Sequence, residues 1–103
     1  MEISIKLDML SEIVFHDKTL IKDLIDSLIQ DMEEQFDQLK ATSEYPFKTI
    51  HYLKSSFAMV GCVEGIKSCE KLIQTKDPMD FQSLVLIFEQ LKEKLLNPQS
   101  SIQ

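Results

Sequence analysis

The longest regular pattern in this chain is a series of apolar residues spaced three and four apart between residues 18 and 40. This spacing has the period of an α-helix, so we predict one long helix of about six turns. Asp17 stands directly before it and is a suitable N-cap residue. The apolar arc is wider than one neighbour needs, which favours a helix that packs against two others or keeps an edge for a partner. Its apolar residues are Leu20, Ile21, Leu24, Ile25, Leu28, Ile29, Met32, Phe36 and Leu39.

Shorter stretches with the same spacing predict four further helices, over residues 7–15, 44–60, 62–75 and 79–96. Because the connections between the four longer helices are short, neighbouring helices should run antiparallel. We therefore predict an all-α fold, an antiparallel up-down four-helix bundle with a short additional N-terminal helix over one end. The bundle is expected to occupy residues 1–96 as a single domain, and residues 97–103 to form a flexible C-terminal tail.

Proline and glycine mark the ends of the helix predicted over residues 44–60. Pro46 is tolerated only in its first turn, and Gly61 is suited to the position that follows a helix. The buried side of this helix is expected to consist of Ile50, Leu53, Phe57 and Val60. The buried side of the next helix is expected to consist of Val63, Ile66, Cys69 and Ile73.

Composition and charge argue against several classes of partner. The net charge of −6 leaves no basic stripe for nucleic acid or for an anionic membrane surface. No apolar run approaches the roughly 20 residues that span a bilayer, and the first residues lack the order of a signal peptide. We therefore expect a cytoplasmic protein. Cys62 and Cys69 lack zinc-ligand spacing and would lie about 10 Å apart on one helix, so half-buried free thiols are expected.

His51 is the residue that carries a chemical hypothesis. On a helix it lies about 140° from the centre of the apolar side, with Lys54 and Ser55 one turn further on and Ala58 two turns on. Metal binding is disfavoured because no usual ligand stands one turn away. Acid–base hydrolysis is disfavoured because no carboxylate is placed to orient the ring. Nucleotide binding is disfavoured because the two glycines form no phosphate-binding loop.

The same stretch resembles the core motif of histidine-containing phosphotransfer (HPt) domains of bacterial and fungal phosphorelays. In that family a helix carries His-x-Leu-Lys-Gly-Ser, followed by a Leu-Gly pair and often by a cysteine. The matching residues here are His51, Leu53, Lys54, Ser55, Ser56, Val60, Gly61 and Cys69. Ser55 replaces the usual glycine, and Ile73 stands where some members place a glutamine that contacts the histidine.

The resemblance implies a phosphorelay intermediate. His51 would accept a phosphoryl group from a receiver-domain aspartate and pass it to another receiver domain. Lys54 would stabilise the phosphoryl charge, and Ser55 could donate a hydrogen bond to a phosphoryl oxygen. No cofactor is expected on this chain, since Mg²⁺ would belong to the partner receiver domain. Autonomous kinase activity and ATP binding are not expected.

The resemblance also implies partners, namely the receiver domains of a hybrid sensor kinase and of a response regulator. The sequence leaves the oligomeric state open, and we expect a monomer. Ala58 would leave clearance for the docking partner. Further docking residues would be Leu20 and Leu24 on the wide apolar arc, together with Met9 and Ile13 on the short helix before it. Two alternatives remain open: a helical adaptor that binds a partner without phosphorylation, and an inhibitor that docks a kinase or response regulator.

Overall fold

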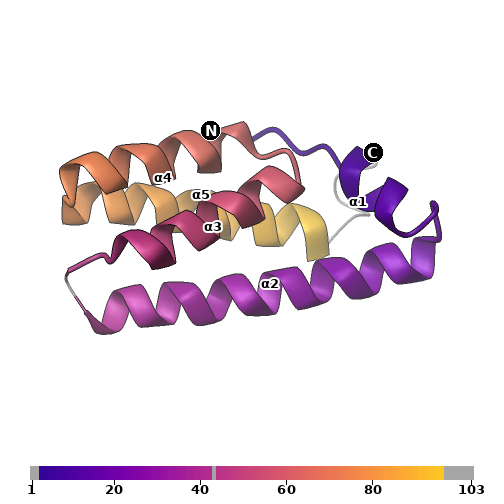
Figure 1. Ribbon diagram of the computed structural model, residues 1–103, viewed down its shortest axis with the longest axis horizontal. Coiled ribbons are helices and arrows are strands. Elements are labelled where there is room, and N and C mark those ends of the chain that lie inside the picture. The colour runs from indigo at the N-terminus through magenta and orange to yellow at the C-terminus, as the bar shows by residue number, and fades with distance from the viewer. Residues whose placement is uncertain (1–2, 43, 97–103) are drawn as a thin grey trace.

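The computed structural model describes residues 3–42 and 44–96, and this part of the chain is helical without strands (Figure 1). The predicted tail at 97–103 lies outside the described residues. None of the described helices is both long and apolar enough to cross a membrane. The helices are α1 (Asp8–Ile13), α2 (Lys18–Ala41), α3 (Phe47–Met59), α4 (Val63–Thr75) and α5 (Pro78–Leu96).

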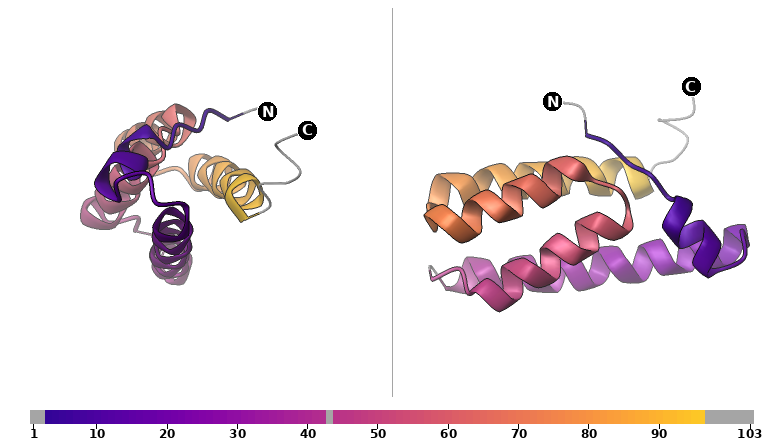
Figure 2. Two further views of the ribbon diagram at one scale, coloured as in Figure 1. Left: turned by 90° about the vertical axis from the view of Figure 1, so that its right-hand side faces the viewer. Right: turned by 45° about the horizontal axis from the view of Figure 1, so that its top comes forward.

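The four longer helices pack as a bundle (Figures 1 and 2). α3 contacts α2 and α4, α5 contacts α4 and α2, and α1 packs against α2. An all-α fold is therefore confirmed. Between the helices lies one apolar core, whose most completely buried residues are Leu10, Met32, Leu39, Ile50, Leu53, Phe57, Val60, Cys62, Cys69, Leu72, Leu84 and Leu91.

The predicted N-cap of the long helix is confirmed, whereas the preceding helix is shorter than predicted. The Asp17 carboxylate accepts hydrogen bonds from the backbone N–H groups of Thr19 (2.9 Å) and Leu20 (3.1 Å). α1 ends at Ile13 instead of residue 15, because Phe15 and His16 both adopt positive φ angles of 53° and 62°. Such angles are incompatible with a right-handed helix.

α3 begins at Phe47, three residues later than predicted, and Pro46 is its N-cap residue instead of lying in its first turn. Tyr45 explains the shift. Its φ angle is 49°, and its buried ring stacks on Phe81 of α5 with ring centroids 5.1 Å apart. The Lys76 ammonium also donates a hydrogen bond to the Tyr45 carbonyl. Tertiary contacts thus hold this segment in a non-helical conformation.

Gly61 ends α3 as predicted, and its small size lets the N-terminal segment cross the α3–α4 turn. Its φ angle of 66° is one that glycine adopts without strain. A Cβ atom at this position would lie 2.7 Å from the Cβ of Lys6. The Lys6 N–H donates to the Val60 carbonyl at 2.7 Å, which fixes the crossing segment to the end of α3.

The predicted buried side of α4 is wrong in part. Cys69 is buried as expected, but Val63 is exposed, and the buried face consists of Gly65, Cys69 and Leu72. The reason is Gly65, because a Cβ atom there would overlap the Phe57 ring. The face of α4 that carries Gly65 therefore turns toward α3, and the missing side chain lets the two helices approach closely.

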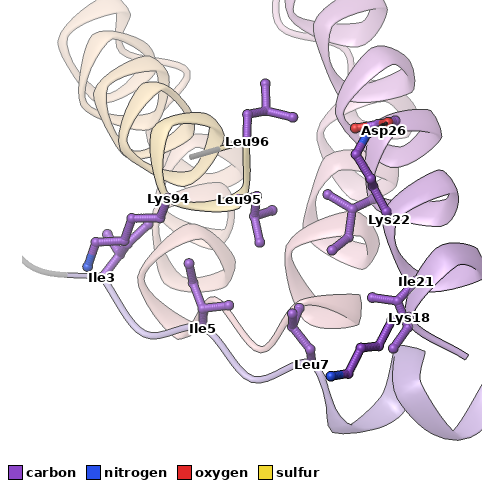
Figure 3. A pocket seen from close by; sticks show the side chains of 11 residues that line it. Ile3, Ile5, Leu7, Lys18, Ile21, Lys22, Asp26, Lys94, Leu95 and Leu96 are labelled. Carbon is purple, nitrogen blue, oxygen red and sulfur yellow. Dashed lines mark hydrogen bonds and ion pairs between the residues drawn. The ribbon is translucent and has the colours of Figure 1, made fainter. Parts of the chain in front are cut away.

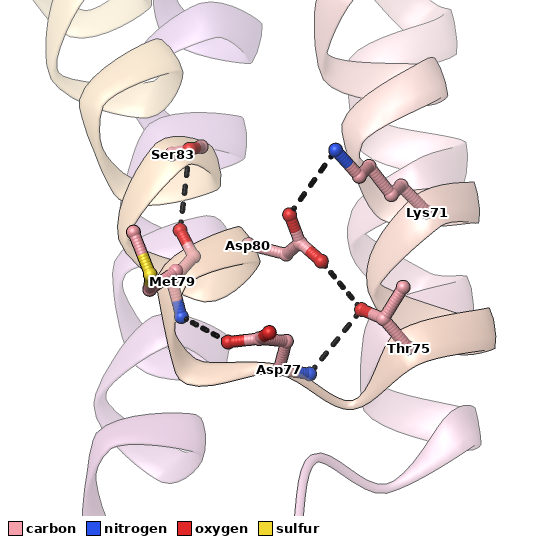
Figure 4. A network of polar contacts seen from close by, with 6 residues as sticks. All are labelled: Lys71, Thr75, Asp77, Met79, Asp80 and Ser83. Atoms are coloured by element: carbon pink, nitrogen blue, oxygen red, sulfur yellow. Dashed lines mark hydrogen bonds and ion pairs between the residues drawn. The ribbon is translucent and has the colours of Figure 1, made fainter.

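The α4–α5 turn is held by a polar network (Figure 4). The Asp77 carboxylate accepts from the Met79 N–H at 2.8 Å and so caps α5. Thr75 accepts from the Asp77 N–H at 3.2 Å and donates to Asp80 at 2.6 Å, while Lys71 pairs with Asp80 at 3.4 Å. These contacts fix the turn that carries the chain from α4 into α5.

Candidate functional site

His51 is exposed in the middle of α3, on the side away from the core. Ile50, Leu53 and Phe57 of the same helix are fully buried, so the predicted division of α3 into a buried side and a solvent-exposed side is confirmed. The imidazole stacks on the exposed Phe47 ring one turn earlier, with ring centroids 5.6 Å apart and an angle of 17° between the planes. This contact covers one face of the imidazole and leaves its edge available.

A groove of about 450 Å³ runs between α2 and α3 beside this histidine. Its lining is mainly apolar and includes Leu24 and Leu28 of α2 with Tyr52 and Met59 of α3. His51 and Ser55 also line it. The fold therefore brings His51, Ser55 and Leu24, three of the residues selected from the sequence, to one surface depression.

Lys54 turns away from this groove toward α4. Its ammonium lies 3.0 Å from a carboxylate oxygen of Glu70, and the two side chains are 32% and 51% exposed. An ion pair with this exposure contributes at most about 1 kcal/mol and can open readily. Lys48, three residues before His51, is the lysine that lines the groove together with the imidazole.

The Ser55 hydroxyl is engaged with its own helix. It donates to the His51 carbonyl at 3.2 Å, the backbone bond that serine commonly forms within helices. A hydrogen bond from Ser55 to a bound phosphoryl group therefore requires a change of rotamer. Ala58 is exposed, so the position leaves room for a partner.

The remaining residues selected as docking positions lie on α1 and on the first turns of α2. Met9, Ile13 and Leu20 are 54%, 56% and 49% exposed. Leu20 and Leu24 are one turn apart and therefore share one face of α2. The exposed Leu20 therefore lies one turn before Leu24, which is half-buried and lines the groove beside His51.

Four residues of the site were missed from the sequence: Phe47, Lys48, Asp31 and Glu70. Phe47 and Lys48 lie four and three residues before His51, so helical spacing alone could have indicated them. Asp31 of α2 lines the groove, and Glu70 of α4 reaches Lys54. Neither could have been found without the packing of α2 and α4 against α3.

The cysteines lie inside the bundle, apart from this surface. Both are free and fully buried, not half-buried as expected. Burial raises the pKa of the Cys62 thiol, and it raises the pKa of Cys69 to about 12 although the Lys54 ammonium opposes part of the effect. Both therefore stay protonated at neutral pH. Within residues 3–42 and 44–96, no group of three or more His, Cys, Asp and Glu side chains is placed to hold a metal ion.

Comparison of the chain with protein-family models, with curated proteins and with solved structures finds no match.

Proposed function

We propose that this chain is a phosphorelay intermediate of the HPt type that accepts a phosphoryl group on His51 from a receiver-domain aspartate and transfers it to another receiver domain. The observation that carries the proposal is the exposed imidazole beside an apolar groove. The sequence offsets of Leu53, Lys54 and Gly61 from His51 support the same function.

The chemistry requires an accessible ring nitrogen. Its lone pair attacks the phosphorus of an aspartyl phosphate, the P–O bond to the aspartate breaks, and the carboxylate leaves. The ring then loses its N–H proton from the other nitrogen to water, which gives a neutral phosphohistidine ring. In-line attack needs an unobstructed edge of the imidazole. The stacking of Phe47 on the ring face is compatible with this, because it leaves the edge available.

Charge near the phosphoryl oxygens comes from lysines on either side of His51. Lys54 supplies it once its ion pair with Glu70 opens, and Lys48 supplies it from within the groove. The Mg²⁺ ion belongs to the partner receiver domain. The partner docks over the groove and over the exposed apolar residues of α1 and α2, as apolar surface bordered by polar residues commonly does in protein interfaces.

We also propose the architecture that goes with this function, an antiparallel up-down four-helix bundle with α1 as a short additional helix. The short connections and the pairwise contacts of α2 to α5 support it. In Figure 1 the colour gradient advances in opposite directions along α2 and α3 and again along α4 and α5, which agrees with antiparallel neighbours. A cytoplasmic, monomeric chain fits these partners.

The test is phosphoryl transfer from a panel of ³²P-loaded receiver domains to the full chain, to the His51→Gln variant and to a His16→Gln control. We expect an acid-labile, base-stable label on the wild-type chain and on His16→Gln, and none on His51→Gln. His16 is a suitable control because it is the other histidine of the sequence and is also exposed.

The adaptor alternative predicts a different result. A chain that works by docking alone would bind its receiver equally well with glutamine at position 51, and no receiver in the panel would label it. Label retained on His51→Gln, or absent from the wild-type chain across all receivers of the same cell, would contradict the phosphorelay proposal.

A further inference from the structure

A second and larger depression, of about 700 Å³, lies at one end of the bundle (Figure 3). It opens between the first turns of α2 and the last turn of α5, away from the residues around His51. This volume lies within the usual range of small-molecule sites. We call this depression the terminal groove. No role in phosphoryl transfer accounts for it.

The N-terminal segment forms one wall of the terminal groove. Ile3, Ile5 and Leu7 line it, and Figure 3 shows Ile5 and Leu7 directed into the space between α5 and α2. The residues between these apolar ones, Ser4 and Lys6, fix the segment to the rest of the bundle through backbone hydrogen bonds. The Ser4 N–H donates to the Glu64 carboxylate at 2.8 Å, and the Lys6 N–H donates to the Val60 carbonyl. These two hydrogen bonds therefore fix the wall of the terminal groove that the N-terminal segment forms.

The walls that α2 and α5 contribute to the terminal groove are also aliphatic, and the space between them is open. Ile21 and Ile25 come from α2, and Leu95 and Leu96 come from α5. Ile21 and Leu95 remain partly exposed, and Leu96 is exposed. Burial of such aliphatic surface by a ligand is favourable because it removes apolar area from water.

The charge around the terminal groove is unlike that of the whole chain. Lys18, Lys22 and Lys94 line it with a single carboxylate, Asp26, although the chain carries a net charge of −6. Lys22 pairs with Asp26 at 3.0 Å, so the charges of Lys18 and Lys94 are not balanced by a carboxylate of the lining. Figure 3 shows these two lysines on opposite sides of the groove. An apolar trough flanked by cations is complementary to a molecule with a hydrocarbon chain and an anionic head.

We propose that the terminal groove binds a single-chain anionic amphiphile of the fatty-acid class. The hydrocarbon chain lies against Ile3, Ile5, Ile21 and Leu95, and the carboxylate pairs with Lys18 or Lys94. The chain's own residues 97–103 are a poorer occupant, because Ile102 is the one large aliphatic residue among them. This inference is independent of the proposed phosphoryl transfer.

The experiment is a titration of dodecanoate, below its micelle concentration, into the full chain with isotope-labelled isoleucine methyl groups. We expect saturable shifts at Ile3, Ile5 and Ile21. The Lys18→Ala/Lys94→Ala double variant should bind about three- to tenfold more weakly, the loss expected for one or two exposed ion pairs. A Lys40→Ala/Lys67→Ala control removes two exposed lysines outside the groove and should bind as the wild type does. Dodecanol, which lacks the charge, should bind the wild type as weakly as dodecanoate binds the double variant.

Three results would overturn the proposal. The first is the absence of saturable shifts at these methyl groups, or shifts confined to the groove beside His51. The second is equal affinity of the wild type and the Lys18→Ala/Lys94→Ala variant for dodecanoate. The third is a gain of about tenfold or more when Ile102 is changed to serine in the full chain, which would identify residues 97–103 as the natural occupant.

Discussion

At the scale of single residues, the surroundings of His51 decide what its imidazole can do. Phe47 stacks on one face of the ring, and the Ser55 hydroxyl bonds to the backbone of the same turn. Lys54 is held by Glu70 on the neighbouring helix. The phosphoryl-binding charge expected from Lys54 is thus partly neutralised in the resting protein. In the proposed reaction Glu70 would act through this lysine, as a positioning residue.

Glu70→Gln should therefore speed phosphoryl transfer to His51, because it frees the Lys54 ammonium for the incoming phosphoryl group. An exposed ion pair of this kind is worth up to about 1 kcal/mol, so we expect a gain of up to about fivefold in single-turnover transfer. Lys54→Ala should slow transfer. The Glu70→Gln/Lys54→Ala double variant should lose the gain, which separates the effect from any role of Lys48.

Glu33→Gln is the matched control for this prediction. It removes a comparable surface carboxylate that pairs with Lys92 of α5 at 3.4 Å and does not line the groove beside His51. Its transfer rate should equal that of the wild type. A gain in Glu70→Gln that persists without Lys54 would show that the carboxylate acts on the docking partner directly.

At the scale of elements, two contacts set the position of α4. Gly65 lets the Phe57 ring of α3 lie against the α4 backbone, and Glu64 ties the N-terminal segment to the first turn of α4. The Ser4 hydroxyl adds a second bond to Glu64 at 3.2 Å. Both contacts lie near the point where α3 passes into α4, and the bonds between Ser4 and Glu64 also fix the N-terminal segment that lines the terminal groove.

Gly65→Ala should destabilise the protein by about 1–3 kcal/mol, the cost of forcing extra volume into a packed contact. At an open helical position the same change would stabilise by about 0.5–1 kcal/mol, so the sign itself is diagnostic. Urea unfolding measures the free energy, with Lys67→Ala on the exposed side of α4 as the control. In a Phe57→Leu background the cost of Gly65→Ala should shrink; an unchanged cost would place its cause elsewhere.

The tie between the N-terminal segment and α4 should depend on pH. The Ser4 N–H hydrogen bond holds the pKa of Glu64 below its usual 4.5. A lowered folded-state pKa gives stability that is present above pH 4.5 and is lost as the pH falls through the folded pKa. Glu64→Gln should therefore lower Tm near neutral pH and have little effect at the lowest pH at which the chain stays folded.

Asp80 in the first turn of α5 should affect stability with the same dependence on pH, which makes it a useful comparison. The Thr75 hydroxyl and then Lys71 hold the pKa of Asp80 below its usual 3.8. The stability that Asp80 contributes is therefore present above pH 3.8 and is lost as the pH falls further. This loss begins at a lower pH than the loss of the Glu64 contribution, which begins near pH 4.5.

For Glu64, a Tm difference between Glu64→Gln and wild type that grows as the solution is acidified would contradict the hydrogen bond as its source.

At the scale of the whole molecule, one core joins all five helices. Leu10 of α1, Met32 of α2, Phe57 of α3, Leu72 of α4 and Leu91 of α5 are all fully buried. The stacked rings of Phe36 and Phe88, with centroids 4.5 Å apart, join α2 to α5. A single core of this kind is expected to unfold cooperatively.

Cys62 and Cys69 should report that cooperativity. Their burial and raised pKa values leave little accessible thiolate at pH 8, so 5,5′-dithiobis(2-nitrobenzoate) should label both slowly in native buffer. The labelling should accelerate together with loss of helical circular dichroism in urea. Gln74→Cys, an exposed position on α4, should label at once and serves as the control. Rapid labelling of either native cysteine would indicate local opening around α4.

The sequence by itself determined the helical class, the buried side of α3, the Asp17 cap and the glycine at the end of α3. Each of these depends on residues within a few positions of one another, because helical periodicity and capping are local. The exposure of His51 followed from the same periodicity.

The tertiary structure alone decided which face of α4 is buried, where α3 begins, and what surrounds His51. Gly65 meets Phe57, Tyr45 packs on Phe81, and Glu70 reaches Lys54 only because separate helices come together. The terminal groove likewise needs residues from both ends of the described chain. The spacing of residues along the chain does not indicate contacts between residues distant in sequence, so these contacts become known only when the packing of the helices is known.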